Sequence, residues 1–321
     1  MQLNMGNTRI IREMIDVFGM DLYEELLFSD LPFFEECIAE IKLNKEKYTG
    51  IGISIKSKKI AQGKVIFESI ERASLFCDKA KKRDFIKSTI KALDNHNIKH
   101  IDIDNEAYFS KSQIIDTNQR RLKININNEF SWTKGVDLYM REKILIPSQL
   151  VFLDSIKDEK IIQQQISTGA AGGNTLNDAI LRGIFKVIER DAFMIHYLAK
   201  TYGGLIDFSM NKRLIKIKRY FKKYNLELYL VNLPTDLGIY TYMAFIIDKT
   251  GLGIPFFTGM KTGINPYNIA IGAIEESYMV IVFSRNKLLK KMMLKVKKFI
   301  QLEIVNYFGW IIINYNISIP G

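Results

Sequence analysis

The sequence predicts an α+β fold, in which strands and helices are mixed without a regular strand–helix–strand repeat. Apolar residues recur at helical spacing in several long segments. Other segments show period-two alternation or short apolar runs bounded by turn residues. Of the 321 residues, 47% are apolar and 25% are charged, which is the balance of an ordinary globular protein. The length corresponds to one large domain or two ordinary ones.

The expected elements follow one another along the chain. Residues 1–47 alternate apolar pairs with acidic residues and predict two helices separated by residues 29–32. Residues 50–54 predict a short strand or a glycine-bearing turn, and residues 60–82 predict a long helix. Further strands are expected within residues 100–109, 121–132, 143–153, 226–234, 241–248 and 255–260, and further helices within residues 176–199 and 267–283.

The net charge of +11 is concentrated in two segments. Residues 211–223 carry seven Lys or Arg and residues 286–298 carry six, with no acidic residue in either. Basic segments can bind nucleic acid or anionic membranes. In residues 211–223 the apolar residues recur at helical spacing, which favours a helix with a solvated basic face and an apolar face turned inward. No zinc-finger spacing or RNA-binding aromatic motif occurs, so we do not expect a nucleic-acid partner.

The sequence shows no targeting or membrane-spanning segment. Charged residues interrupt the first twenty positions, and the longest apolar stretch, residues 304–315, is shorter than the roughly 20 residues of a spanning helix. The two cysteines are too few for a disulfide scaffold. We therefore expect a soluble, cytoplasmic protein without a membrane partner. Among the histidines, His96 and His100 are expected to face solvent and His196 to be buried, and none belongs to a catalytic or zinc arrangement.

Two acidic residues in the 60–82 helix indicate a place for a cation. Glu68 and Glu71 are three residues apart, so both carboxylates leave the same face of the helix. Carboxylates this close repel each other unless a cation lies between them. That cation is either Arg72, in a structural ion pair, or Mg²⁺. The tripeptide Ile-Glu-Arg occurs in this helix at residues 70–72 and again at residues 188–190, which indicates a pseudo-repeat of two helices.

A glycine-rich turn precedes the second of these helices. Gly169, Gly172 and Gly173 allow the backbone to approach a ligand closely, and the amides at a helix N-terminus attract anions. The segment is not a Walker-type loop, because no Lys-Ser or Lys-Thr follows the glycines, and a simple tight turn is the alternative. With the acidic pair, this turn makes a phosphate-and-magnesium site the best chemical hypothesis from the residues alone.

Four segments, in order, resemble the motifs of the YcaO family. Residues 50–74 resemble its first ATP-site motif, a glycine-bearing segment followed by a helix with E-x-x-E-R. Residues 131–153 are similar to a segment with a Trp, a Gly-x-x-Leu and a later Pro. Residues 167–192 resemble its most specific motif, a Ser/Thr-Gly-Ala-Gly-Asn-Thr turn feeding a helix that ends Glu-Arg-Asp-Ala. Residues 231–277 resemble its following strand pair, Gly and acidic helix.

The resemblance implies a YcaO-like α+β fold, with mixed sheets and two pseudo-repeated helices that enclose a site for ATP and Mg²⁺. It covers residues 48–285 and leaves an N-terminal helical segment, 1–47, and a basic and apolar C-terminal segment, 286–321. On the family pattern the Mg²⁺ ligands are Glu68, Glu71 and Glu189. The residues that contact ATP or its metals are Asn174, Asp178, Arg190 and Arg285. We expect Glu71 and Glu189 to lie within about 15 Å of each other around one acidic cavity.

The activity implied by the resemblance is ATP-dependent activation of backbone amides in a ribosomally synthesised precursor peptide, which forms azoline rings. The implied partners are the precursor peptide and a separate leader-binding protein of the E1-like or ThiF-like kind. Related members make thioamides. The chain departs from the family at Lys186, where the family usually has Glu, at Asp178, where it usually has Glu, and in its NISIPG end, which has one proline. A shortened or degenerate member that serves as a scaffold is therefore the alternative. We expect Lys186 to face the acidic site and to replace one Mg²⁺.

Overall fold

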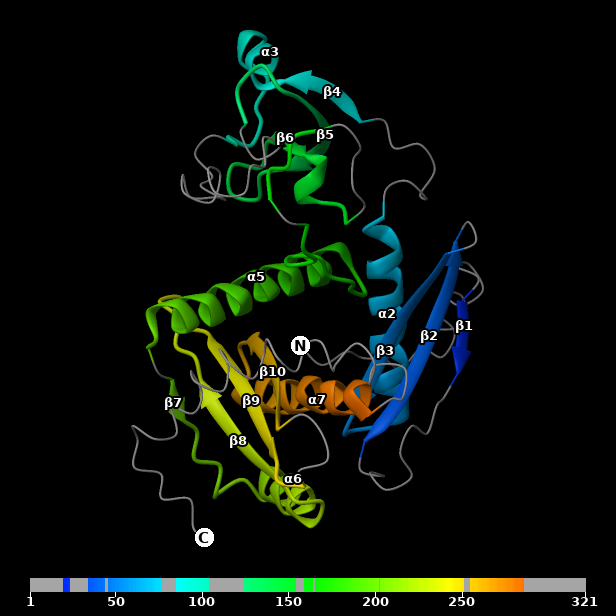
Figure 1. The fold of residues 1–321 in the computed structure, drawn as a ribbon, viewed down its shortest axis with the longest axis vertical. Helices are drawn as coiled ribbons and strands as arrows, with labels where there is room; N and C mark the ends of the chain where they lie inside the picture. Colours follow the sequence, from blue (N-terminus) through cyan, green and yellow to red (C-terminus); the bar gives the residue numbers. More distant parts are fainter. Residues whose placement is uncertain are drawn as a thin grey trace. The chain divides into compact units, whose positions relative to one another are not determined.

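The computed structural model describes residues 20–23, 34–43, 46–76, 85–103, 124–153, 159–163, 165–201, 203–250 and 255–285. The chain divides into two compact units (Figure 1). Unit 1 comprises residues 1–40, 49–69 and 171–321, and unit 2 comprises residues 41–48 and 70–170. The division expected from the sequence, at residues 47/48 and 285/286, stays a prediction.

Unit 1 is built on a four-stranded antiparallel sheet in the order β10-β9-β8-β7. Its strands are β7 (Gly204–Leu205), β8 (Leu226–Asn232), β9 (Tyr240–Asp248) and β10 (Phe256–Gly263). The register places Leu230 opposite Ala244 and Ala244 opposite Gly259. The three long strands were predicted from their apolar runs, and the prediction is confirmed.

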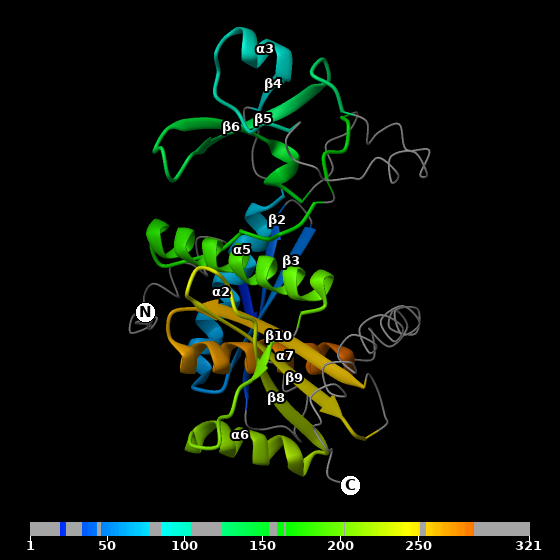
Figure 2. The ribbon, with the colours of Figure 1, turned by 90° about the vertical axis from the view of Figure 1, so that its left-hand side faces the viewer.

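Three helices cover the two faces of this sheet (Figure 2). On one face, Ala192 and Phe193 of α5 (Leu176–Ala199) pack against residues of β8, β9 and β10. On the other face lie α6 (Lys212–Lys223) and α7 (Pro266–Arg285). The expected bounds of 176–199 are confirmed for α5. The buried residues of α6 are Leu214, Ile217 and Phe221, so its basic side chains lie on the solvated face, as predicted.

A three-stranded sheet, in the order β1-β2-β3, precedes the first long helix. Its strands are β1 (Met20–Tyr23), β2 (Glu35–Leu43) and β3 (Glu46–Ser54), and the helix is α2 (Lys58–Ser74). The prediction of helices within residues 1–47 is wrong at β1 and β2. The successive residues Cys37, Ile38 and Ala39 are all buried, so β2 is covered on both faces and lacks the alternation that marks a half-exposed strand. Residues 1–19 and 24–33 lie outside the described residues.

Unit 2 contains a second three-stranded sheet, in the order β4-β5-β6. Its elements are β4 (Ile86–Thr89), α3 (Ile90–Asn95), β5 (Glu129–Val136), β6 (Lys143–Pro147) and the short 3₁₀ helix η2 (Ser148–Leu150). The indole of Trp132 is fully buried, and its Nε1 donates a hydrogen bond to the Ser88 carbonyl at 3.0 Å. The strand expected within 121–132 begins only at Glu129, because Asn125–Asn128 form a turn.

Three further expectations concern residues of unit 2. The prediction that His100 faces solvent is wrong, because its side chain is only 10% exposed, its ring packs on Trp132 and its Nε2 lies 3.0 Å from Oδ1 of Asp94. His100 makes an isolated bridge with Leu145, whereas residues 104–109 of the strand expected there are outside the described part. His96 is exposed, as expected. In unit 1 the expectation for His196 is confirmed, since it is buried with Nδ1 2.7 Å from the Ala192 carbonyl.

The helix expected over residues 60–82 is found as α2, and residues 77–84 lie outside the described part. No helix among the described residues is long and apolar enough to pass through a lipid bilayer.

Candidate functional site

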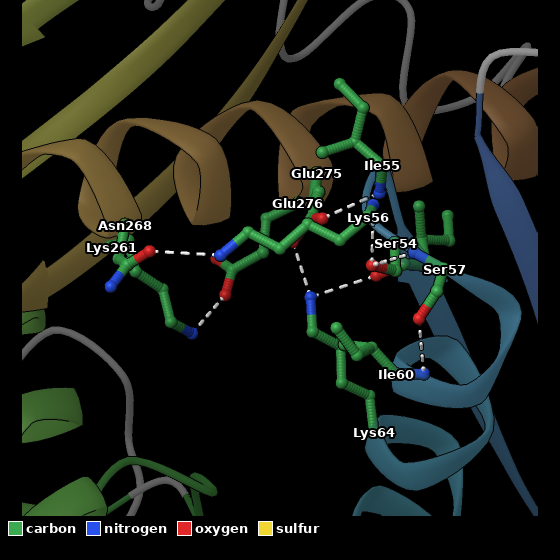
Figure 3. A network of polar contacts seen from close by, with 11 residues as sticks. Ser54, Ile55, Lys56, Ser57, Ile60, Lys64, Lys261, Asn268, Glu275 and Glu276 are labelled. Carbon is green, nitrogen blue, oxygen red and sulfur yellow. Dashed lines mark hydrogen bonds and ion pairs between the residues drawn. The ribbon is translucent and has the colours of Figure 1, made fainter. Parts of the chain in front are cut away.

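The candidate site lies at β10, the edge strand of the unit 1 sheet, which α5 and α7 both approach. A side chain at Gly263, the last residue of β10, would meet Ile269 of α7 and Phe185 of α5. Two residues earlier, Lys261 reaches Glu276 of α7, with 2.6 Å between Nζ and Oε1. Figure 3 shows both acidic residues of α7 directed toward lysines that come from other elements.

Glu189 of α5 shares this electrostatic environment. Burial, followed by the negative charge of Glu276, raises the pKa of Glu189 to about 8, although the positive charges of Lys261, Arg190 and Lys186 oppose the shift. Conversely, the charge of Glu276, and to a smaller extent that of Glu189, raises the pKa of Lys261 above its usual value. Lys261 is therefore a fixed cation beside the Glu276 carboxylate and in the electrostatic environment of the Glu189 carboxyl group.

The neighbouring acid of α7, Glu275, belongs to a separate and closed arrangement (Figure 3). Its Oε2 lies 2.5 Å from Nζ of Lys64 in α2, and its Oε1 accepts a hydrogen bond from the Ile55 amide at 2.8 Å. The Lys64 ammonium also donates to the Ile53 carbonyl at 2.9 Å. Because the Glu275 side chain is only 7% exposed, its carboxylate is largely shielded from water, and the ion pair joins α2 and β3 to α7.

The glycine-rich turn ends in a well-capped helix start. The Thr175 hydroxyl accepts a hydrogen bond from the Asp178 amide at 3.1 Å, which caps α5. In return the Asp178 carboxylate accepts the Asn174 amide at 3.2 Å and Nε of Arg182 at 2.9 Å. Partial burial acts to raise the pKa of Asp178, but these hydrogen bonds outweigh it and hold the pKa below its usual value. Asp178 therefore holds the turn in place as an ionised carboxylate.

The turn also lies against α2. A Cβ at Gly172 would stand 3.0 Å from both Cβ and the carbonyl oxygen of Phe67, so only glycine permits this approach without a shift of the neighbouring backbone. The next residue of α2, Glu68, accepts a hydrogen bond from the Ile51 amide at 3.3 Å. Unit 1 thus brings the start of α5 beside the helix that carries Glu68.

Four other residues were expected at or near the site, and their places in the structure differ. Glu71 lies one turn beyond Glu68 on α2, but the boundary between the units falls between residues 69 and 70, so its convergence with Glu189 stays a prediction. Arg190 is exposed, and its guanidinium lies 5.9 Å from the centre of the Phe193 ring. Arg285 is the last residue of α7, and its side chain is outside the described part. Lys186 is half-buried on α5, and its charge acts to lower the pKa of Glu189, whereas its replacement of a Mg²⁺ ion stays a prediction.

The residues present fit Mg²⁺ when phosphate oxygens complete its coordination. Among the described residues, no three carboxylate, imidazole or thiol side chains are grouped closely enough to hold a metal ion by themselves. Mg²⁺ commonly takes only one or two protein carboxylates and fills its remaining positions with phosphate oxygens and water. The Glu189–Glu276 pair supplies carboxylates of this kind, and it is already partly neutralised by Lys261.

Sequence reasoning did not select Lys64, Lys261 or Glu275. One signal was available, since Glu275 and Glu276 are the only acids in α7, and an acidic pair inside an apolar helix needs cations nearby. Nothing in the sequence indicated which lysines would supply them.

An α+β unit with a capped, glycine-bearing helix start and carboxylates at a sheet edge suits a phosphate ligand with a divalent cation. The chain belongs to the YcaO family: the family's sequence pattern, described as that of the ATP- and Mg²⁺-binding YcaO cyclodehydratases, matches residues 56–296. The family and the cofactors expected from the sequence are thereby confirmed.

Two solved structures share the fold of this chain. A heterocyclase in complex with substrate and cofactor aligns with a TM-score of 0.72 at 18% identity, over 90% of this chain and 41% of that protein. YcaO from Methanopyrus kandleri, bound with AMPPCP and Mg²⁺, aligns with a TM-score of 0.61 at 17% identity, over 83% of this chain and 63% of that protein. The expected α+β, YcaO-like fold is confirmed.

Similarity to curated sequences is confined to part of the chain. An uncharacterized protein in the tfuA 3′ region of Rhizobium leguminosarum bv. trifolii is 24% identical over 176 residues, which are 51% of this chain and 38% of that protein. The chain spans about two fifths of the length of the curated relatives that it matches.

Proposed function

We propose that this chain activates backbone amides of a ribosomally synthesised precursor peptide with ATP and so forms azoline rings. The observation that supports the proposal is the arrangement within unit 1, where a capped helix start lies against α2 and carboxylates of α5 and α7 share one environment. Phosphoryl transfer requires positioning and charge neutralisation more than covalent chemistry from the protein. A helix N-terminus and carboxylates suited to Mg²⁺ meet both needs.

The proposed reaction balances as an ATP-driven loss of water. The side chain of a neighbouring Cys, Ser or Thr of the precursor adds to the amide carbonyl and loses its proton. The amide oxygen takes the γ-phosphoryl group of ATP, leaving ADP, and then departs as phosphate while the amide nitrogen loses its proton and forms the C=N bond. Transition states of this kind are stabilised by groups fixed where negative charge develops.

Each expected residue has a proposed part in this reaction. Glu68, Glu71 and Glu189 hold Mg²⁺, which neutralises phosphate charge when it is bound. The residues proposed to contact ATP or its metals are Asn174, Asp178, Arg190 and Arg285. Each oxygen of Asp178 accepts one hydrogen bond, from Asn174 or Arg182, so Asp178 would hold the turn in position and contact ATP or its metals as well.

Calorimetric titration of the full chain with ATP tests this proposal. We expect saturable binding that requires Mg²⁺ and is weakened by Glu189→Gln. The matched control is Glu227→Gln, which alters a carboxylate on β8 whose partner Lys249 lies 3.7 Å away at the surface. Absence of binding at about 1 mM nucleotide would contradict the proposal, since enzymes rarely work with weaker substrate affinity.

Lys186 favours a second candidate, a YcaO-like scaffold that no longer turns over ATP. An ammonium replaces the usual carboxylate three residues before Glu189, and its charge acts on that residue. A scaffold would bind the precursor or a partner protein without hydrolysing ATP, so phosphate release in the presence of precursor distinguishes the two functions.

The proposed partners are the precursor peptide and a separate leader-binding protein of the E1-like or ThiF-like kind. If sulfide takes the place of the substrate side chain as nucleophile, the same activation yields a thioamide. Mass spectrometry separates the two outcomes, because ring formation removes water whereas thioamide formation exchanges oxygen for sulfur.

A further inference from the structure

The position of the Lys261 side chain depends on a glycine in α7 as well as on charge. Its side chain lies across Gly272, where an added Cβ would stand 2.9 Å from Cγ and 3.1 Å from Cδ of the lysine. These distances are tighter than ordinary van der Waals contact, so the absence of a side chain at position 272 leaves room for the lysine. The ammonium at the end of this path contacts Glu276.

The two lysine–glutamate pairs of α7 differ in their access to solvent (Figure 3). The Glu275 side chain is 7% exposed, and each of its oxygens accepts a hydrogen bond, from Ile55 and from Lys64. The Glu276 side chain is 36% exposed and that of Lys261 is 40% exposed. The carboxylate of the first pair is therefore closed off from solvent although Lys64 is partly exposed, whereas both side chains of the second pair are accessible to a ligand that brings its own charge.

Charge compensation at Glu189 comes from the chain itself. The positive charges that act on it are those of Lys261, Arg190 and Lys186, and the negative charge that opposes them is that of Glu276. Divalent-cation affinity rises with the number of uncompensated carboxylates in a site. A lysine ammonium beside two carboxylates therefore lowers the affinity of that place for a divalent ion.

We propose that Lys261 is the resident cation of this site, and that its ammonium takes the place of one Mg²⁺ beside Glu189 and Glu276. The consequence for nucleotide rests on the proposed function: ATP is bound with one divalent ion fewer than the carboxylates alone would require. The consequence for the free protein does not depend on nucleotide. The pair has little affinity for a divalent ion while Lys261 is present and gains affinity when it is removed.

The test is titration of the nucleotide-free full chain with Mn²⁺ at about pH 8, following free Mn²⁺ by electron paramagnetic resonance. We expect Lys261→Met to bind Mn²⁺ about tenfold more tightly than the parent. Lys261→Arg, which keeps a cation, is expected to behave as the parent. The matched control is Lys249→Met, which removes a lysine from the surface pair with Glu227. Equal Mn²⁺ affinity in the parent and Lys261→Met would overturn the proposal.

Two more variants assign the effect to this site. Glu276→Gln in the Lys261→Met background is expected to abolish the gained affinity, and persistence of the gain would contradict the assignment. Gly272→Ala displaces the Lys261 side chain without changing any charge, and we expect this variant to raise Mn²⁺ affinity too. It keeps the proposal testable if Lys261→Met does not fold. If the parent fails to bind ATP but these shifts are seen, the proposed function is wrong and the role of Lys261 stands. If ATP binds but Mn²⁺ affinity does not change in these variants, the role proposed for Lys261 is wrong and the proposed function stands.

Discussion

The Nζ atom of Lys64 lies 2.5 Å from Oε2 of Glu275, and this pair joins residues 211 positions apart in the sequence. The carboxylate is nearly buried and has one further hydrogen bond, from the Ile55 amide. The lysine is 36% exposed, so water can replace part of its interaction. The pair fixes α7 against the start of α2, and the neighbouring Glu276 is positioned with it.

Removal of Lys64 should destabilise unit 1. Lys64→Met leaves the Glu275 carboxylate shielded without its cation, and we expect a loss of about 2 kcal/mol in the free energy of unfolding in urea, below the full value for a buried pair because Lys64 is partly solvated. The double variant Lys64→Met/Glu275→Gln should recover part of this loss, because no uncompensated charge remains. A loss below about 0.5 kcal/mol for the single variant would show that the pair is not structural.

Gly172→Val should weaken nucleotide binding without unfolding the protein. The new side chain would collide with Phe67, so the turn before α5 must move away from α2. We expect at least about a tenfold loss in ATP affinity, because the anion-binding amides are displaced. Gly204→Ala serves as control, since apart from the adjacent residues of the chain no heavy atom lies within 4 Å of a Cβ there. Unchanged ATP affinity in Gly172→Val would place the nucleotide elsewhere.

The cap of α5 should matter for binding as well as for stability. Thr175→Ala removes the hydroxyl that accepts the Asp178 amide, and we expect a loss of about 1 kcal/mol in unfolding free energy together with weaker ATP binding. Asn211→Ala removes the corresponding cap of α6, whose Oδ1 accepts the amides of Arg213 and Leu214. We expect a similar loss of stability there but unchanged ATP affinity. Equal effects of both variants on ATP binding would argue against a site at the start of α5.

The stability of the metal-free protein should fall as the pH rises through the titration of Glu189. Burial and the charge of Glu276 raise its pKa from 4.5 to about 8, so the folded state retains a proton that the unfolded chain has already released. The stabilisation is complete below the unfolded pKa and is lost as the pH approaches the folded one. We expect urea unfolding in EDTA to show a decline between these values that Glu189→Gln reduces. Parallel pH profiles for parent and variant would contradict the assignment.

Lys186→Glu should restore a carboxylate three residues before Glu189 and increase Mg²⁺-dependent ATP binding. The expected cause is the loss of a positive charge that now acts on Glu189. Glu71→Gln is expected to decrease the same binding in either background. Titrations with ATP at several Mg²⁺ concentrations check both variants. An unchanged metal dependence in Lys186→Glu would mean that this lysine does not replace a metal ion.

Several parts of the fold follow from local sequence pattern. The bounds of α5 were predicted from the helical pattern that follows the glycine-rich turn, and the inward apolar face of α6 from helical spacing of its apolar residues. The strands β8, β9 and β10 are apolar runs between turn residues. These elements could be predicted because hydrogen bonds and side-chain spacing within a few residues define them.

The same local reasoning was wrong where burial on both sides removes the alternation of a strand. The buried run Cys37–Ala39 in β2 resembles one side of a helix when only its neighbours in the chain are considered. For the site, the motif order indicated Asn174, Asp178 and Glu189, and the structure places the first two in the cap of α5. The motif order did not indicate Lys64 or Lys261.

The sequence by itself determined the family, the kinds of element and the residues at the start of α5, because these depend on patterns that neighbouring residues carry. The tertiary structure alone decided which charges meet. Lys261 reaches Glu276 because β10 and α7 pack together and Gly272 leaves room for its side chain. Lys64 reaches Glu275 across 211 positions because α2 and α7 are brought together in unit 1. Electrostatic pairing depends on distance in space, and no local pattern encodes that distance.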